Sequence, residues 1–211
     1  ITADTINAAA NQSTTNSDIR FNGATVLSAV TTLDTDANAG DVTFTDILNG
    51  DGNGPWDLVL QPGTGNIQFS GNVSGVNRLG HVQIPTANNV TVDPGVSFTA
   101  EQFTQTAGDG DTQFGGVVTM TNPDLSAGGD ISVTTAGAII FDDAMATAGI
   151  DGALNGAAGY SAAGDVTLDA GDTVELAQVT TDGGSPGCGC SGASAGSVTV
   201  TAANGITLNG D

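Results

Sequence analysis

The chain almost lacks positive charge. It contains no Lys, and its two Arg residues, Arg20 and Arg78, stand against 23 acidic residues, which gives a formal net charge of −21. A protein that binds nucleic acid needs Lys and Arg to neutralise phosphates, and binding to anionic lipid needs the same residues. The composition therefore excludes a general nucleic-acid binder and disfavours a membrane-surface protein. A fold this acidic repels itself, so we expect salt, divalent cations or a basic partner to screen it.

Long apolar runs and aromatic side chains are also scarce. No stretch reaches the roughly 18 apolar residues that a transmembrane helix needs, so we expect no membrane insertion. Aromatic residues make up 4% of the chain, so Val, Ile, Leu, Ala and Phe must build most of the core. The chain opens on Ile1 without an initiator Met or a signal peptide, and we therefore expect a processed product or one segment of a larger protein.

Gly is abundant, with 32 residues, and it opens a phrase that recurs along the chain. The phrase is Gly, a polar residue, and then alternating apolar and polar residues. It restarts 35 residues (129 to 164) and then 32 residues (164 to 196) later, and in these three copies a second short strand pattern follows. Short strands at a fixed period, with Gly at the corners, are typical of stacked repeats. The copies lie at 40–44, 129–133, 164–168 and 196–200.

The strand patterns are too short, and the corners too frequent, for long hairpins. In a parallel stack each strand lies about 4.8 Å from its equivalent in the next coil. Inward residues such as Val42, Phe44, Ile67 and Phe69 would then form apolar ladders. We predict one all-β unit over 1–211, a parallel β-helix (β-solenoid) of about eight coils and about 40 Å in length. A two-sheet β-sandwich is the alternative.

Three segments depart from the strand pattern. Residues 1–18 are predicted to form an irregular N-terminal edge. Residues 144–164 and 181–196 are predicted to be loop insertions, and because they occupy the same place in successive repeats they would line up on one face. The second insertion contains Cys188 and Cys190. These residues would form a local pair, a link to a neighbouring copy, or a metal site that needs two further ligands.

Calcium is the ligand that the acidic turns favour. Segment 49–54 places oxygen-bearing side chains at alternate positions with Gly at the sixth, as an EF-hand loop does. The twelfth position is Leu60 rather than Glu, so the segment is no EF-hand, and ordinary polar turns are the alternative. Two further Asp residues would complete a looser shell, and a second turn is also a candidate. The predicted ligands are Asp46, Asn49, Asp51, Asn53, Asp57, Asp109 and Asp111.

Few residues favour catalysis. Asp142 and Asp143 are adjacent, so on a strand they would point to opposite faces and would not act as a pair. His81 is expected to be a surface strand residue. We therefore predict that the protein is not an enzyme. Arg20 and Arg78 would either pair with nearby Asp residues or, as scarce cations on an acidic surface, serve as contacts between subunits.

Segments 40–44, 63–75 and 205–210 resemble the strand repeats of large bacterial surface proteins. These are the β-strand-repeat adhesins, akin to filamentous haemagglutinin and the passenger stalks of autotransporters, and the resemblance covers roughly 40–211. It implies a right-handed parallel β-helix within a long, secreted fibre at the cell surface. It brings no catalytic residues to this chain. The long insertions and the strong acidity depart from the family pattern.

The expected function follows from an open-ended stack. Uncapped ends leave backbone groups that pair with the next unit. We expect a structural or adhesive segment of an extracellular fibre that stacks head to tail on copies of itself or on neighbouring repeats of a longer chain. The alternative is an adhesin module that binds a glycan or a surface protein through the two aligned insertions.

Overall fold

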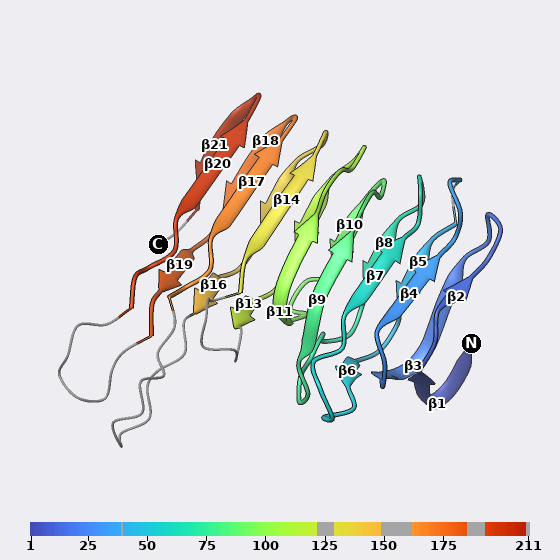
Figure 1. Ribbon diagram of the computed structural model, residues 1–211. Helices are drawn as coiled ribbons and strands as arrows, with labels where there is room; N and C mark the ends of the chain where they lie inside the picture. The colour runs from blue at the N-terminus through green and yellow to red at the C-terminus, as the bar shows by residue number, and fades with distance from the viewer. Residues whose placement is uncertain (39, 122–128, 149–161, 185–192, 210–211) are drawn as a thin grey trace, which may run out of the picture.

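The computed structural model describes residues 1–38, 40–121, 129–148, 162–184 and 193–209. Within these ranges the protein is all-β, with strands joined by turns and no helix. The strands lie side by side in a long row that runs from the N-terminus to the C-terminus (Figure 1). No helix of the described residues has the length and apolarity to cross a membrane.

The strands form two sheets, and every strand pair that the structure describes is parallel. The ten-stranded sheet contains β1 (Thr2–Ala8), β3 (Ile19–Leu27), β5 (Val42–Phe44), β8 (Ile67–Phe69), β10 (Val90–Val92), β12 (Thr112–Phe114), β15 (Ile139–Phe141), β18 (Thr173–Leu176) and β21 (Gly205–Leu208) in spatial order, with β6 (Leu48–Gly50) paired to β3. Antiparallel pairs, which a β-sandwich is built from, do not occur among the described strands.

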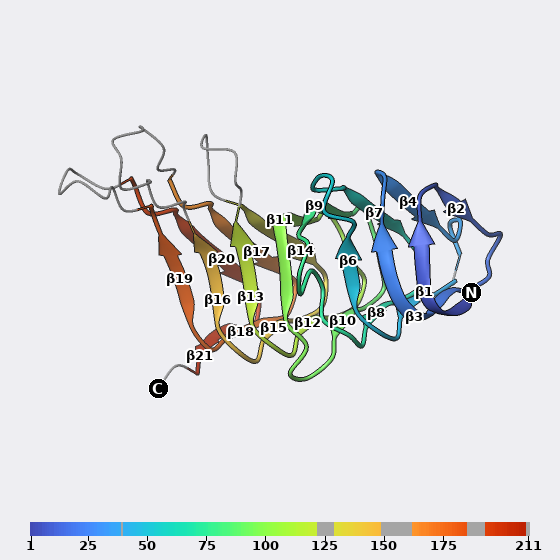
Figure 2. The ribbon, with the colours of Figure 1, turned by 90° about the horizontal axis from the view of Figure 1, so that it is seen from below.

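The eleven-stranded sheet has a main path and a branch. Figure 2 shows β19, β16, β13 and β11 side by side along one face. The main path contains β19 (Val179–Asp182), β16 (Met145–Ala148), β13 (Val118–Thr121), β11 (Phe98–Gln105), β9 (Leu79–Ile84), β7 (Leu58–Gln61), β4 (Thr31–Asp34) and β2 (Gln12–Ser13), and the branch from β11 contains β14 (Ile131–Thr135), β17 (Val166–Ala170) and β20 (Val198–Ala202).

Two long strands turn corners, and they show how the chain winds. The first part of β3 pairs with β5 and its last part pairs with β6. In the same way, β11 pairs with β13 through its first residues and with β14 through its last. One strand edge thus meets two successive strands of the following repeat, so neighbouring repeats trace the same path. The predicted parallel stacking is confirmed, and the arrangement is consistent with a solenoid-like fold.

The core contains the apolar ladders that alternation predicts. Val42, Phe44, Ile67 and Phe69 are all buried, and β5 pairs with β8 so that Val42 lies opposite Ile67 and Phe44 opposite Phe69. The ring of Phe44 stacks on that of Phe69 with centroids 5.4 Å apart. Each buried apolar side chain of this size is worth roughly 1.5–3 kcal/mol, so the ladder is a main source of stability.

A row of Phe side chains runs along the ten-stranded sheet from Phe21 to Phe141. Val92 interrupts this row, and side chains from β11 fill the space. Val92 lies between Phe69 and Phe114 in the register of β8, β10 and β12. Phe98 meets Phe69 and Phe114 edge to face, with centroids 5.5 Å and 5.6 Å away. Phe103 in turn packs against Phe98 and Phe114. The smaller residue at position 92 thus coincides with a cluster of rings in the middle of the molecule.

Two predictions of local structure are wrong. Residues 1–18 are not irregular, because they contain β1 and β2, which pair with β3 and β4. The segments 144–164 and 181–196 do not begin as loops, because β16 occupies Met145–Ala148 and β19 extends to Asp182. Ala and Thr dominate these strands, so alternation is weak, and pairing through the backbone decides their conformation. The remainder of both predicted insertions lies largely outside the described residues, as do Cys188 and Cys190.

Candidate functional site

A ladder of Asp and Asn side chains runs along one corner of the molecule. Each member stands directly before a strand and accepts a hydrogen bond from the backbone N–H of its equivalent in the next repeat. The donor-to-acceptor distances are 2.9, 2.8, 3.2, 2.8 and 2.8 Å from Asp41 to Ala138. These bonds provide acceptors for backbone N–H groups at the corners, where the sheet provides none. The members of this Asx ladder are Asp18, Asp41, Asn66, Asn89 and Asp111.

Asn66, in the middle of the Asx ladder, is bonded on both sides. Its amide donates to Asp41 Oδ1 at 3.0 Å, and its Oδ1 accepts from the amides of Asn88 and Asn89 at 3.0 and 2.9 Å. The neutral residues Asn66 and Asn89 separate the carboxylates of Asp41 and Asp111, whereas Asp18 and Asp41 are direct neighbours in the ladder. Sequence reasoning missed the ladder, although an Asp or Asn before each short strand at near-constant spacing is a readable signal.

A shorter ladder, in which Asp side chains again accept from backbone N–H groups of the next repeat, lies toward the C-terminus. Asp130 Oδ1 accepts from the backbone N–H of Asp165, and Asp165 Oδ1 accepts from that of Ser197. Bonds from the backbone N–H and then the hydroxyl of Ser197 hold the pKa of Asp165 below its ordinary value of 3.8. The Gly-Asp phrase that marks the repeats in the sequence thus has a structural cause.

The predicted calcium ligands mostly serve the backbone in the same way. Asp46 Oδ1 accepts from the N–H of Ile47, and Asp57 Oδ1 accepts from that of His81, at 2.7 and 2.8 Å. Asn49 Oδ1 accepts from the N–H of Val76 at 3.2 Å. Asp111 belongs to the Asx ladder, and the backbone N–H of Asp109 donates to Ala87 O at 3.1 Å. Within the described ranges, no three His, Cys, Asp or Glu side chains gather as a metal site would require, and calcium binding stays a prediction.

Asp51 organises the loop that we considered for calcium. Its Oδ1 accepts from the backbone N–H of Asn53 at 2.9 Å and from Trp56 Nε1 at 2.7 Å, and its Oδ2 accepts from the Asn53 amide at 2.8 Å. The bond from the Asn53 side chain is the largest cause that lowers the pKa of Asp51 below 3.8, followed by those from the Asn53 backbone and Trp56. The carboxylate therefore fixes both the turn and the indole.

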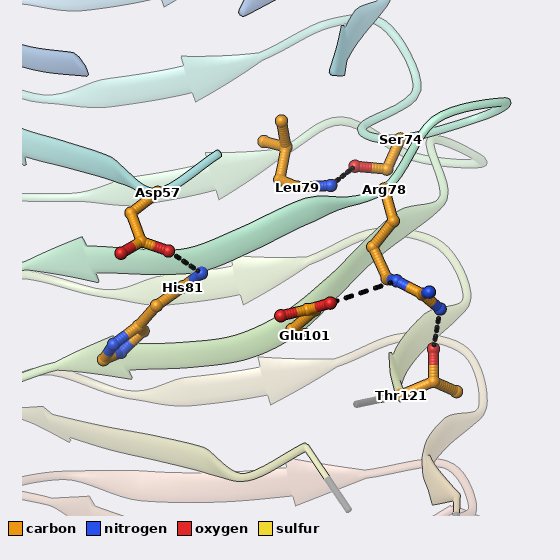
Figure 3. Close-up of polar contacts among 7 residues, drawn as sticks. All are labelled: Asp57, Ser74, Arg78, Leu79, His81, Glu101 and Thr121. Atoms are coloured by element: carbon orange, nitrogen blue, oxygen red, sulfur yellow. Dashed lines mark hydrogen bonds and ion pairs between the residues drawn. The ribbon is translucent and has the colours of Figure 1, made fainter. Parts of the chain in front are cut away.

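Arg78 makes contacts within the chain (Figure 3). Its Nη1 donates to Thr121 Oγ1 at 3.0 Å, and its Nε lies 3.6 Å from Glu101 Oε1. The expected local ion pair exists, but its partner is Glu rather than Asp. Arg20 lies in β3 and is exposed, where its Nε donates to Asn22 Oδ1 at 2.7 Å. A role for either Arg between subunits stays a prediction.

A cavity of about 430 Å³ opens beside Arg78. Its lining comes from the loop after β6, from the loop before β9 and from β11. We call it the Arg78 cavity. The 23 residues from Arg78 to Glu101 match one repeat, which equals the spacing from Asn66 to Asn89, so the sequence period could have brought this pair together. Its walls include Gly52, Gly54, Pro55, Val76, Arg78 and Glu101.

His81 lies in β9, as predicted for a strand residue, and is half-buried. Its Nε2 lies 2.8 Å from Thr104 Oγ1 in the next repeat. Burial lowers the pKa of His81, while the charges of Asp57 and Asp130 oppose that shift. Asp57 also accepts the hydrogen bond from the backbone N–H of His81. The ring bridges two repeats.

Asp142 and Asp143 lie in the bend after β15 rather than in a strand. Asp142 Oδ2 accepts from Gln113 Nε2 at 2.7 Å, whereas Asp143 Oδ1 accepts from the backbone N–H of Ala144. The two carboxylates therefore have different partners. Neither contact identifies a catalytic arrangement, and the absence of enzymatic activity stays a prediction.

Comparison of the chain with known protein families, with characterised proteins and with solved structures finds no match.

Proposed function

We propose that this protein is a parallel β-helix of about eight coils that serves as a structural segment of an extracellular fibre. The observation that carries the proposal is the state of the last repeat. Ile206 and Leu208 of β21 are 50% and 73% exposed, whereas Val174 and Leu176, their partners in β18, are 0% and 2% exposed. Positions that are core in one repeat are thus open to solvent in the next.

The backbone of the last repeat supports the same proposal. Among the described strands, β21 pairs only with β18 and β20 pairs only with β17. A free strand edge beside an apolar row is a template for one more parallel strand. The occupant that fits is a further repeat of the same kind, supplied by another copy or by a longer chain. At the opposite end, β1 pairs only with β3 among the described strands.

The charge of the protein fits an elongated, separate rod. A net charge of −21 spread along the flanks would repel neighbouring rods sideways, while the apolar terminal row favours contact end to end. Salt would weaken the lateral repulsion and leave the apolar contact intact. Growth along one axis is the expected result.

Electron microscopy of the purified protein tests the proposal. We expect filaments whose axial repeat is close to the length of one chain, and we expect Leu208→Asp to shorten or abolish them because it places a charge on the end contact. Val76→Asp is the matched control, because Val76 is 81% exposed on a loop of the flank, and it should leave filaments unchanged. Isolated short rods of the unmodified protein, or filaments that tolerate Leu208→Asp, would contradict end-to-end stacking.

A second candidate is an adhesin module that binds a glycan or a surface protein through the segments 144–164 and 181–196. The observation that favours it is that β16 and β19 are paired, with Met145 opposite Val179, so both segments leave the sheet from neighbouring strands. Replacement of 149–161 by a short Gly-Ser linker separates the two functions. Loss of attachment to a glycan-coated surface with intact filaments would favour the module, and loss of filaments would favour an assembly role.

A further inference from the structure

The Arg78 cavity places a donor group and an acceptor group side by side in one wall. Arg78 has a side chain that is 36% exposed, and Glu101 has one that is 15% exposed. A guanidinium can only donate hydrogen bonds, and a carboxylate can only accept them. Thr121 accepts from Nη1 of the guanidinium, and the partly exposed Arg78 side chain lines the cavity.

The walls of the cavity are held in place before any ligand arrives. Asp51 fixes one loop through Asn53 and Trp56. Ser74 Oγ accepts from the backbone N–H of Leu79 at 2.8 Å and fixes the start of the other loop (Figure 3). The backbone N–H of Gly50 donates to Asn77 O at 3.0 Å and joins the two loops. A preformed site loses little conformational entropy on binding.

The charges of the cavity narrow the class of ligand. An anion would meet the Glu101 carboxylate within a protein of net charge −21, and a cation would meet the Arg78 guanidinium. A neutral ligand with adjacent donors and acceptors can accept from the guanidinium and donate to the carboxylate at the same time. The apolar surfaces of Pro55 and Val76 suit the C–H face of such a ligand. The volume of about 430 Å³ lies in the range of roughly 300–1,000 Å³ that small-molecule sites occupy.

From this chemistry we infer that the Arg78 cavity binds a neutral, hydroxyl-rich ligand, namely a short oligosaccharide. Each sugar hydroxyl both donates and accepts, so neighbouring hydroxyls would accept from the Arg78 guanidinium and donate to the Glu101 carboxylate. The site lies on the flank of the rod, away from the last repeat. It is therefore independent of end-to-end stacking, and either proposal can fail without the other.

Isothermal titration calorimetry tests the inference with maltotriose, cellotriose, mannotriose and xylotriose as neutral probes and with trigalacturonate as the anionic probe. We expect at least one neutral probe to bind. Arg78→Gln should weaken that binding about tenfold or more, because a bond to a charged group is lost. Arg20→Gln is the matched control, since it makes the same charge change at an exposed residue outside the cavity, and it should have no effect.

A second variant fills the cavity without touching its charges. Gly54 lines the cavity, and a Cβ added there meets nothing closer than the Trp56 ring at 3.9 Å, so Gly54→Val should fold and block the ligand. Circular dichroism and a denaturant titration of each variant show whether the fold is intact. No binding of any neutral probe at millimolar concentration, tighter binding of trigalacturonate, or binding that survives both Arg78→Gln and Gly54→Val would each overturn the inference.

Discussion

The middle of the molecule and its last repeat use the same strand register but bury very different amounts of surface. In the middle, Phe98 and Phe103 are fully buried among rings from neighbouring repeats. In the last repeat, Val198 is 46% exposed and Leu208 is 73% exposed. The difference is not in residue type, since both regions alternate apolar and polar residues. It is in whether a repeat is covered on both sides.

This comparison separates two roles for apolar side chains in a stacked fold. A covered side chain stabilises its own chain, whereas an uncovered one at the end of the stack is, in the proposed end-to-end stacking, the contact for the next unit. Stability in such folds is close to a sum over repeats and their interfaces. Substitutions in the middle should therefore change unfolding, and substitutions in the last repeat should change assembly.

The largest expected effect is at Phe98. Replacement by Ala removes ring contacts to Phe69, Phe103 and Phe114 and leaves a cavity, so the free energy of unfolding should fall by about 3–5 kcal/mol. Denaturant titration monitored by circular dichroism measures it.

The control for this prediction is Leu208→Ala in the last repeat. Surface substitutions usually change stability by less than about 0.5 kcal/mol, and Leu208 is mostly exposed. Both measurements should be made at a concentration where filaments are absent, because a filament would cover the last repeat. A similar loss of stability in both variants would mean that the last repeat is covered in solution.

A smaller effect is expected at Asn66 in the Asx ladder. Asn66→Ala removes acceptors for Asn88 and Asn89 and a donor to Asp41. Loss of these partly buried hydrogen bonds should reduce the free energy of unfolding by about 1–3 kcal/mol. Asn66→Asp keeps the acceptor but places a carboxylate beside Asp41, so it should destabilise more in low salt than in high salt. Equal stability of Asn66→Ala and the unmodified protein would show that the ladder is dispensable.

The sequence was sufficient to predict an all-β fold with parallel strands and to identify the inward residues of the most regular repeats. Alternation at Val42, Phe44, Ile67 and Phe69 places them in the core because a strand side chain must point to one face or the other. It was not sufficient for β1, β16 and β19. These strands are rich in Thr and Ala, and their pairing partners, rather than their own pattern, decide that they are strands.

The site was harder to predict for a related reason. Asp51 and Asp57 have the residue type and spacing of a calcium turn, yet in the structure they bind Trp56 and the backbone of His81. Local spacing does not distinguish a carboxylate that binds a metal from one that caps a backbone. The Arg78 and Glu101 pair depends on the period of the repeat, which is regular from β3 to β12 and is longer in the later repeats.

A prediction about pH concerns the ring of His81, which joins two repeats in the middle. Because burial lowers its pKa, the unfolded chain, with a His pKa near 6.5, binds protons before the folded chain does. The free energy of unfolding should therefore fall as the pH falls below about 6.5 and should stop falling from this cause below the folded pKa. His81→Gln should remove this part of the pH dependence. Urea titrations at about pH 7.5 and about pH 5.5 measure it, and an unchanged slope in the variant would assign it to the carboxylates.

The smallest expected effect is local and concerns Asp51 at the wall of the Arg78 cavity. Its hydrogen bonds lower its pKa below 3.8, so the carboxylate keeps its hold on the indole until the pH falls below that value, and the stability it contributes is lost as the pH falls further. Trp56 is the sole Trp of the chain, so Trp fluorescence reports the surroundings of this side chain, which include Asp51. We expect an emission change on acidification to begin below the ordinary Asp range in the unmodified protein, and Asp51→Ala to show the altered emission already at neutral pH. Identical emission of the two proteins at neutral pH would mean that Asp51 does not hold Trp56, and the loop would then lack the rigidity that the middle of the molecule otherwise shows.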